Sequence, residues 1–137
     1  MVTVCSRELV VSCGLRTLAP DETDYHGFYG GDLFQRDTAY HQGTAWAWLL
    51  GAFAVAHDRV FHDSAAAASY LRPLADHLSD HGIGTISEIF DGDPPHTPRG
   101  CPAQAWSVAE ALRAWRAVHP APTAETETVA TPSSLES

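Results

Sequence analysis

Apolar residues recur at helical spacing in three stretches of the chain. The first, from about residue 44 to residue 59, carries a stripe made of Trp46, Leu49, Leu50, Phe53 and His57. The second, from about residue 64 to residue 81, carries Ala67, Leu71, Leu74 and Leu78 on one face. The third, from about residue 102 to residue 118, places Val108, Leu112 and Trp115 on a face that we expect to be core. This pattern predicts three helices and favours an all-α fold.

Residues at the ends and in the middle of these stretches refine the prediction. Asp63 or Ser64 is suited to cap the second helix, and Pro102 to occupy the first position of the third. Pro73 lies inside the second helix and predicts a bend or break there. Gly51 lies inside the first helix at a cost of about 1 kcal/mol relative to Ala, which indicates a close contact with another helix.

The segments between the helices are long. Residues 5–12 resemble the tail of a helix, whereas residues 19–42 are rich in Gly, Asp and Tyr and have no sustained period. Residues 84–106 place charged and aromatic side chains between prolines, which exclude a continuous helix or a central strand. Long loops inside a compact domain are disproportionately functional, although an acidic surface loop has the same composition. Both interpretations of residues 84–106 stay open at this point.

The end of the chain differs from the rest. Residues 119–137 are poor in apolar side chains and rich in Pro, Thr, Ser and Glu, a composition typical of a disordered tail. We therefore expect one domain over residues 1–118, followed by this tail.

Charge and composition narrow the class of protein. The 137 residues carry a net charge of −9, with eight basic residues, all arginine. A nucleic-acid binder needs a clustered basic surface, so we expect no nucleic-acid partner. No apolar run approaches the roughly 20 residues of a membrane span, and the N-terminus lacks the features of a signal peptide. Three cysteines without paired spacing fit a reducing, cytoplasmic environment.

Neither a metal nor a cofactor is expected. His77 and His81 stand four residues apart, but no third ligand completes a zinc pattern. The sequence contains no dinucleotide fingerprint, phosphate-binding glycine loop or nucleophile elbow. Cys101 and His96 are five residues apart around a proline, which gives no reason to expect a catalytic Cys–His pair.

An acidic chain with aromatic residues in its loops suits a carbohydrate site. Sugars offer hydroxyl groups to carboxylates, amides and Arg, and apolar faces to aromatic rings. Glycoside hydrolysis normally requires two carboxyl groups. Glu88 and Asp91 are three residues apart, so a local turn could place both on one side, but spacing does not set the distance between them.

Three motifs resemble the C-terminal segment of glycogen debranching enzymes, their amylo-α-1,6-glucosidase domain. They are GLRTLAP at residues 14–20, YHQGTAWAWLLGAF at residues 40–53 and ISEIFDGDPPHTPRGCPAQAWSVAEALRAW at residues 86–115. The resemblance extends from about Arg7 to Arg116. It implies an all-α fold that forms part of an (α/α)6 barrel, with three to four helices, and inverting hydrolysis of α-1,6-linked glucose at glycogen branch points.

The same resemblance implies the site residues. Glu88 corresponds to the general base that activates water. The glucose pocket would be lined by Tyr40, His41, Gln42, Trp46, Trp48, Asp91, His96, Arg99, Gln104 and Trp106. By its residue type alone, Trp106 could equally be a large packing residue.

The chain departs from the family in three respects. It has Ala47 where the family typically has proline between two tryptophans, and Pro102 follows Cys101 where a bulkier apolar residue is expected. The largest departure is length, since the family's general acid is an Asp in a Gly-Arg-Asp motif upstream of the segment that this chain resembles. Asp37 is only superficially similar to that Asp. We therefore expect a glycoside hydrolase segment that is incomplete alone. Its expected partners are glycogen or a branched α-glucan and an N-terminal segment of the enzyme. The alternatives are a non-catalytic α-glucan-binding or assembly module and a helical fragment without a function of its own.

Overall fold

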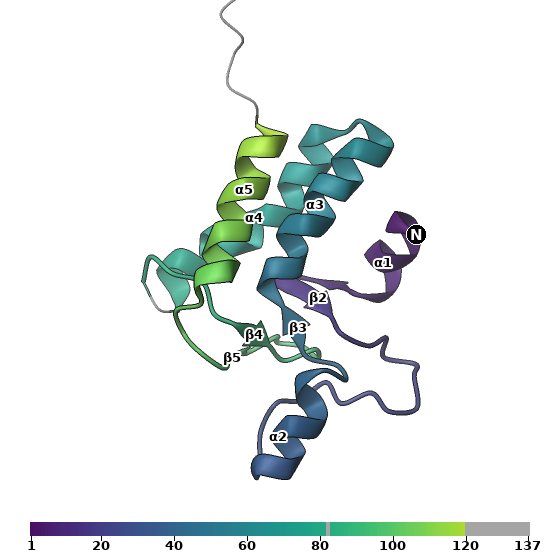
Figure 1. Ribbon diagram of the computed structural model, residues 1–137, viewed down its shortest axis with the longest axis vertical. Coiled ribbons are helices and arrows are strands. Elements are labelled where there is room, and N and C mark those ends of the chain that lie inside the picture. The colour runs from purple at the N-terminus through teal and green to yellow at the C-terminus, as the bar shows by residue number, and fades with distance from the viewer. Residues whose placement is uncertain (82, 120–137) are drawn as a thin grey trace, which may run out of the picture.

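A computed structural model describes residues 1–81 and 83–119 of the chain (Figure 1). The helices in this part are α1 (Val2–Glu8), α2 (Leu33–Tyr40), α3 (Ala47–Phe61), α4 (Ser64–Asp80) and α5 (Ala105–Val118). The strands are β1 (Val10–Val11), β2 (Gly14–Arg16), β3 (Ala45–Trp46), β4 (Ile89–Phe90) and β5 (Pro98–Arg99). The expected disordered tail lies outside the described residues, apart from His119.

The five strands form one antiparallel sheet in the order β1-β2-β3-β4-β5. The expectation of an all-α fold, and with it of part of an (α/α)6 barrel, is therefore wrong. Strands of two or three residues are too short to produce the alternation by which a strand is recognised in a sequence. Their pairing is also non-local, since Trp46 in β3 lies opposite Ile89 in β4.

The sheet joins two parts of the molecule. Helices α3, α4 and α5 pack together on one side of it, and α2 with its flanking loops lies on the other (Figure 1). The larger core cluster lies where the helices meet the sheet and includes Leu15, Leu50, Phe53, Leu74, Ile86 and Phe90. The three-helix layer thus holds the strands from which the loops extend.

The contact between α3 and α5 is close because small residues lie in it. A Cβ atom on Gly51 would lie 2.6 Å from the backbone oxygen of Glu110, so only glycine fits. On α5 the buried residues are Ser107, Ala114 and Val118. The close helix contact predicted from Gly51 is confirmed.

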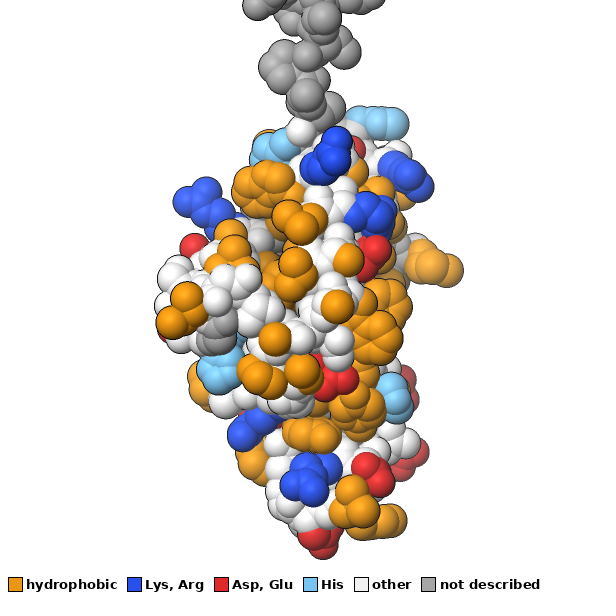
Figure 2. Space-filling view, turned by 60° about the vertical axis from the view of Figure 1, so that its left-hand side comes forward, with side chains coloured by type: hydrophobic (Ala, Val, Ile, Leu, Met, Phe, Trp, Pro, Cys, Tyr) orange, Lys and Arg blue, Asp and Glu red, His pale blue; other side chains and the backbone are white. Residues whose placement is uncertain are grey.

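The predicted core face of α5 is wrong for two of its three residues. Leu112 is 61% exposed and Trp115 is 42% exposed, while Val108 is half-buried. Leu78, which we expected to be buried on α4, is also exposed. These four side chains line an apolar groove of about 430 Å³ between α4 and α5, and Figure 2 shows hydrophobic side chains gathered on this side of the molecule.

Some of the other local predictions are confirmed and others are wrong. Asp63 caps α4 by accepting a hydrogen bond from the Ala66 amide, as predicted. Helix α4 continues through Pro73, so a break there is wrong and a bend stays a prediction. The expected helix over residues 5–12 ends at Glu8, and residues 10–11 are a strand. Helix α2, which the irregular composition of residues 19–42 concealed, begins with a capping box formed by Asp32 and Gln35.

None of the helices in the described part of the chain is both long and apolar enough to cross a membrane.

Candidate functional site

The proline-rich stretch is an irregular β-hairpin. Beyond the two pairs of β4 and β5, the Asp91 amide donates to the Thr97 carbonyl and the Gln104 amide to the Ile86 carbonyl. Pro94 and Pro95 lie at the tip, and Pro98 lies in β5, which is an edge strand of the sheet. This is where proline is tolerated, because its missing N–H group is not required for pairing.

A bulge at Gly100 changes the register of this hairpin beside Glu88. Phe90 pairs with Pro98 and Ile89 with Arg99, so Glu88 would face Gly100 in a regular ladder. Its amide donates instead to the Cys101 carbonyl, at 2.9 Å. Gly100 is the extra residue, and its φ of +67° is one that glycine adopts without strain. Bulges of this kind re-aim side chains, and this one frees the Cys101 amide from the ladder.

The Glu88 carboxylate is held at both of its oxygens. The Tyr40 hydroxyl donates to Oε1 at 2.5 Å, and the Cys101 amide donates to Oε2 at 3.0 Å. Burial, together with the hydrogen bond to Glu88, raises the pKa of Tyr40 above its ordinary value. The hydroxyl therefore stays protonated near neutral pH and remains a donor to this half-buried carboxylate.

Tyr40 reaches Glu88 because the chain turns sharply after α2. The Tyr40 carbonyl accepts hydrogen bonds from the Thr44 hydroxyl, at 2.7 Å, and from the Trp46 indole, at 3.1 Å. Its ring meets the Trp46 ring edge-on, with the centroids 4.8 Å apart. Since Trp46 lies opposite Ile89, the residue after Glu88, the sheet brings this turn and the carboxylate together.

A strip of aromatic rings extends from Tyr40 along the sheet to α5. His41 stacks on Trp46 with an interplanar angle of 5° and a centroid distance of 5.4 Å. Trp106, which is 50% exposed, lies 6.2 Å from Trp46 and 6.4 Å from Trp48. The aromatic strip, as we name these five residues, offers ring surface beside a carboxylate.

A second cluster is built on Asp91, which is buried. Arg99 donates to both carboxylate oxygens, at 3.0–3.3 Å, and the Tyr29 amide donates to Oδ1 at 2.8 Å. The Asp91 backbone oxygen lies 3.1 Å from Nδ1 of His96. Asp91 thus ties the loop that carries Tyr29 to the hairpin, and the Tyr29 ring in turn lies 5.8 Å from the Tyr40 ring.

The structure thus brings most of the predicted site residues together, in two groups. Tyr40, His41, Trp46, Trp48 and Trp106 gather near Glu88, and His96 and Arg99 gather around Asp91. Gln42 and Gln104 make backbone hydrogen bonds. The Gln42 carbonyl accepts from the His26 amide, and the Gln104 amide donates to the Ile86 carbonyl. Their roles as pocket residues stay a prediction.

Residues of the Gly- and Tyr-rich loop were not singled out from the sequence. Tyr29 joins the two groups, the Phe28 ring lies 5.0 Å from the Arg99 guanidinium carbon, and Tyr25 donates to Asp93 at 2.8 Å. The sequence signal that could have identified these residues was the high density of aromatic rings in a loop without periodicity. It marked the loop as a functional surface without indicating which residues matter.

A buried histidine supports the hairpin from behind. Nε2 of His77, in α4, lies 3.1 Å from the Ser87 hydroxyl oxygen, and the Ser87 amide donates to it at 3.4 Å. Burial, and next the charge of His81, lowers the pKa of His77. His77 and His81 stack on each other, and the residues that the structure describes contain no group of three or more His, Cys, Asp or Glu that could hold a metal ion.

A held carboxylate beside a strip of aromatic rings combines two features that glycoside hydrolases use, a carboxyl group for the chemistry and apolar surface for the ligand. Comparison with protein families agrees with this class. A family model described as amylo-alpha-1,6-glucosidase matches residues 1–113. The chain belongs to this family, and its resemblance to the C-terminal segment of glycogen debranching enzymes is confirmed.

Proposed function

We propose that this chain supplies the general base and part of the glucose pocket for inverting hydrolysis of α-1,6-linked glucose at glycogen branch points. In this role Glu88 is the catalytic residue that takes a proton from the attacking water. The observation that carries the proposal is the anchoring of Glu88 by Tyr40 and the Cys101 amide.

The anchoring suits a base because it leaves room for water. A carboxylate has about four lone-pair positions, and the two donors occupy one on each oxygen. The remaining positions are available to accept a proton from water. Two fixed donors also hold the carboxylate in one orientation, which a positioned base requires.

Inverting hydrolysis also requires a general acid on the opposite face of the sugar. Asp91 is unsuited to this task, because Arg99 and the Tyr29 amide already occupy its oxygens and it is buried. We therefore assign the acid to another segment of the enzyme, which would bind this chain as a partner. On this proposal the isolated chain binds glucan but releases little or no glucose.

A complementation assay tests the proposal. The full chain, with and without a co-expressed upstream segment of the family, is incubated with a branched limit dextrin, and released glucose is measured together with its anomeric form. We expect β-glucose as the first product, only when both segments are present, and at least a hundredfold loss in Glu88→Gln, because a positioned base contributes about 10²–10⁴ in rate.

Glu110→Gln is the matched control, since the Glu110 carboxylate is paired with Arg113 on α5, whereas the donors to Glu88 are Tyr40 and the Cys101 amide. It should release glucose at the unaltered rate. Full activity of Glu88→Gln, or α-glucose as the first product, would contradict the proposal.

The aromatic strip also supports a second candidate, a non-catalytic module that binds α-glucan. Trp106 is half exposed next to Trp46 and Trp48, whereas Trp115 is similarly exposed elsewhere on α5, in the apolar groove. This candidate predicts glucan affinity that Trp106→Ala reduces and Trp115→Ala leaves unchanged, without hydrolysis in any combination of segments. Isothermal titration with maltooligosaccharides measures the difference.

A further inference from the structure

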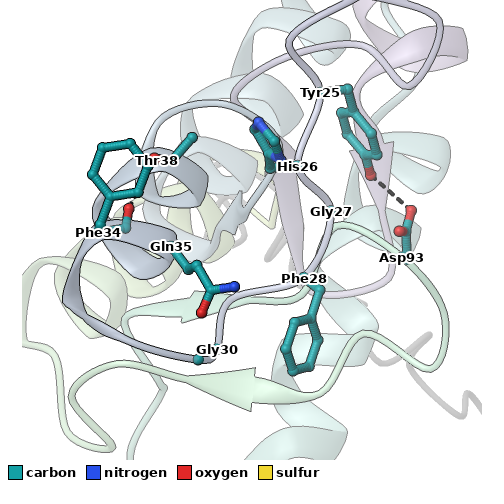
Figure 3. A pocket seen from close by; sticks show the side chains of 10 residues that line it. Tyr25, His26, Gly27, Phe28, Gly30, Phe34, Gln35, Thr38 and Asp93 are labelled. Carbon is teal, nitrogen blue, oxygen red and sulfur yellow. Dashed lines mark hydrogen bonds between the residues drawn. The ribbon is translucent and has the colours of Figure 1, made fainter.

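An open hollow of about 520 Å³ lies beside the candidate site, between α2 and the loop that carries Tyr25 to Gly31. None of its lining residues belongs to the set predicted from the sequence. Figure 3 shows its wall: Phe34 and Thr38 from α2 on one side, Tyr25 and Asp93 on the other, and Gln35 between them. A hollow of this volume is large enough to hold a few sugar rings.

Two aromatic rings border the hollow and are open to solvent. Phe34 is 79% exposed and Phe28 is 61% exposed. Exposed rings that border a concave surface are a common sign of a ligand site. The Phe34 ring offers a flat apolar face of the kind on which the C–H face of a sugar packs, whereas the Arg99 guanidinium lies over the Phe28 ring, 5.0 Å from its centroid.

Polar groups with spare hydrogen-bonding capacity lie among the rings. Asp93 accepts from Tyr25 at Oδ1, while its Oδ2 packs close to Gly27 and accepts no bond from the residues that the structure describes. Gln35 uses its side-chain oxygen to accept from the Asp32 amide. Its amide nitrogen keeps two N–H donors, so these two donors and the Asp93 Oδ2 acceptor are available to a ligand.

Charge selects among possible ligands. Among the residues that the structure describes, Asp93 is the one Asp or Glu side chain that lines the hollow, and no Arg lines it. The chain as a whole carries a net charge of −9. Such a surface repels phosphate and other anions, so a neutral ligand with many hydroxyl groups fits it best.

The hollow and the Glu88 site share their supporting elements. Helix α2 lines the hollow with Phe34 and Thr38 and ends at Tyr40, which donates to Glu88. The loop that contributes Phe28 is anchored by the Tyr29 amide on Asp91, and the Gly92 amide donates to the Gly27 carbonyl. A ligand in the hollow would therefore contact the same helix and the same loop that support the Glu88 carboxylate.

From these observations we infer that the hollow is a second glucan-binding site, which holds neutral α-1,4-linked glucose units of the chain next to the branch. The exposed Phe34 ring, bordered by Phe28, supplies the apolar platform, and Asp93 and Gln35 bind hydroxyl groups. The choice of an α-glucan as the ligand rests on the proposed function, whereas the hollow and its lining do not.

Titration of the full chain with maltoheptaose tests this inference. Phe34→Ala should weaken maltoheptaose binding about five- to tenfold, since it removes the most exposed ring of the platform. Leu33→Ala is the matched control, because Leu33 is a neighbouring residue of the same helix, is 67% exposed and does not line the hollow. Asp93→Asn, which keeps an acceptor for Tyr25, should also weaken binding.

The outcomes separate this inference from the proposed function. Equal affinities of Phe34→Ala, Leu33→Ala and the unaltered chain overturn the second site, and so does the absence of maltoheptaose binding by the unaltered chain. If Phe34→Ala weakens binding while Glu88→Gln releases glucose at the normal rate, the second site stands and the assignment of the base fails. Retention of the unfolding midpoint in each variant confirms that affinity, and not folding, has changed.

Discussion

Gly100→Ala is a direct test of the bulge that positions Glu88. A Cβ atom on residue 100 would lie 2.5 Å from Oε2 of Glu88, where real contacts stay above 3.0 Å. The carboxylate tip must therefore move by at least 0.5 Å, the difference between these two distances. This displacement would weaken the hydrogen bond that the Cys101 amide donates to the same oxygen at 3.0 Å.

Two costs of this substitution can be separated. A left-handed backbone costs a residue other than glycine about 1–2 kcal/mol in the free energy of unfolding. The contact with Glu88 involves the far end of a flexible side chain, so it changes the position of the carboxylate more than it changes stability. A hydrogen bond to a charged group contributes about 1.5–3 kcal/mol, which corresponds to roughly a 10- to 150-fold loss if the base depends on it.

Gly84→Ala isolates the first cost. Gly84 has a φ of +80°, and a Cβ atom there would meet no atom of the described residues within 4 Å. Urea unfolding followed by tryptophan fluorescence should give similar losses of stability in both variants. Glucose release in the complementation assay should fall only in Gly100→Ala. Equal activity in the two variants would refute the claim that the bulge positions Glu88.

Two further predictions concern stability. Gly51→Ala should lower the free energy of unfolding by about 1–3 kcal/mol, because the added Cβ would lie 2.6 Å from the Glu110 backbone oxygen. This loss should exceed the gain from the better helix propensity of Ala. Urea denaturation measures the difference, and a gain in stability would contradict the prediction. The pKa of His77 is lowered in the folded chain, by burial and then by His81, so the unfolded chain takes up this proton first and stability should fall as the pH drops below about 6.5 toward the folded pKa. His77→Gln should flatten that pH dependence in urea denaturation at a series of pH values, whereas an unchanged slope would exclude His77 as its source.

The helices could be predicted where large apolar residues repeat and face the core. This holds for α3, whose Leu50 and Phe53 are buried, and for most of α4. It fails for α5, because the helix approaches α3 through Ser107 and Ala114, and its larger Leu112 and Trp115 remain beside the contact. A prediction from periodicity buries the most hydrophobic side chains. In this contact the buried side chains are instead the small ones, because only they allow the two helices to approach closely.

The candidate site was predicted from motifs and not from geometry. The charged and aromatic residues around Glu88 left two interpretations open, and the resemblance to the family made this stretch the candidate site. The bulge at Gly100 and the pairing of Trp46 with Ile89 could not, because both depend on hydrogen bonds between residues distant in the chain or out of register. Tyr29 and the hollow depend on the same long-range placement.

The bulge has one more consequence, for spectroscopy. The Cys101 amide proton is shared with a side chain instead of a backbone carbonyl, so its environment follows the Glu88 carboxylate directly. Its chemical shift in a nuclear magnetic resonance spectrum is thus a built-in reporter. It would register each displacement of that carboxylate when sugar is added, without a chemical probe attached near the site.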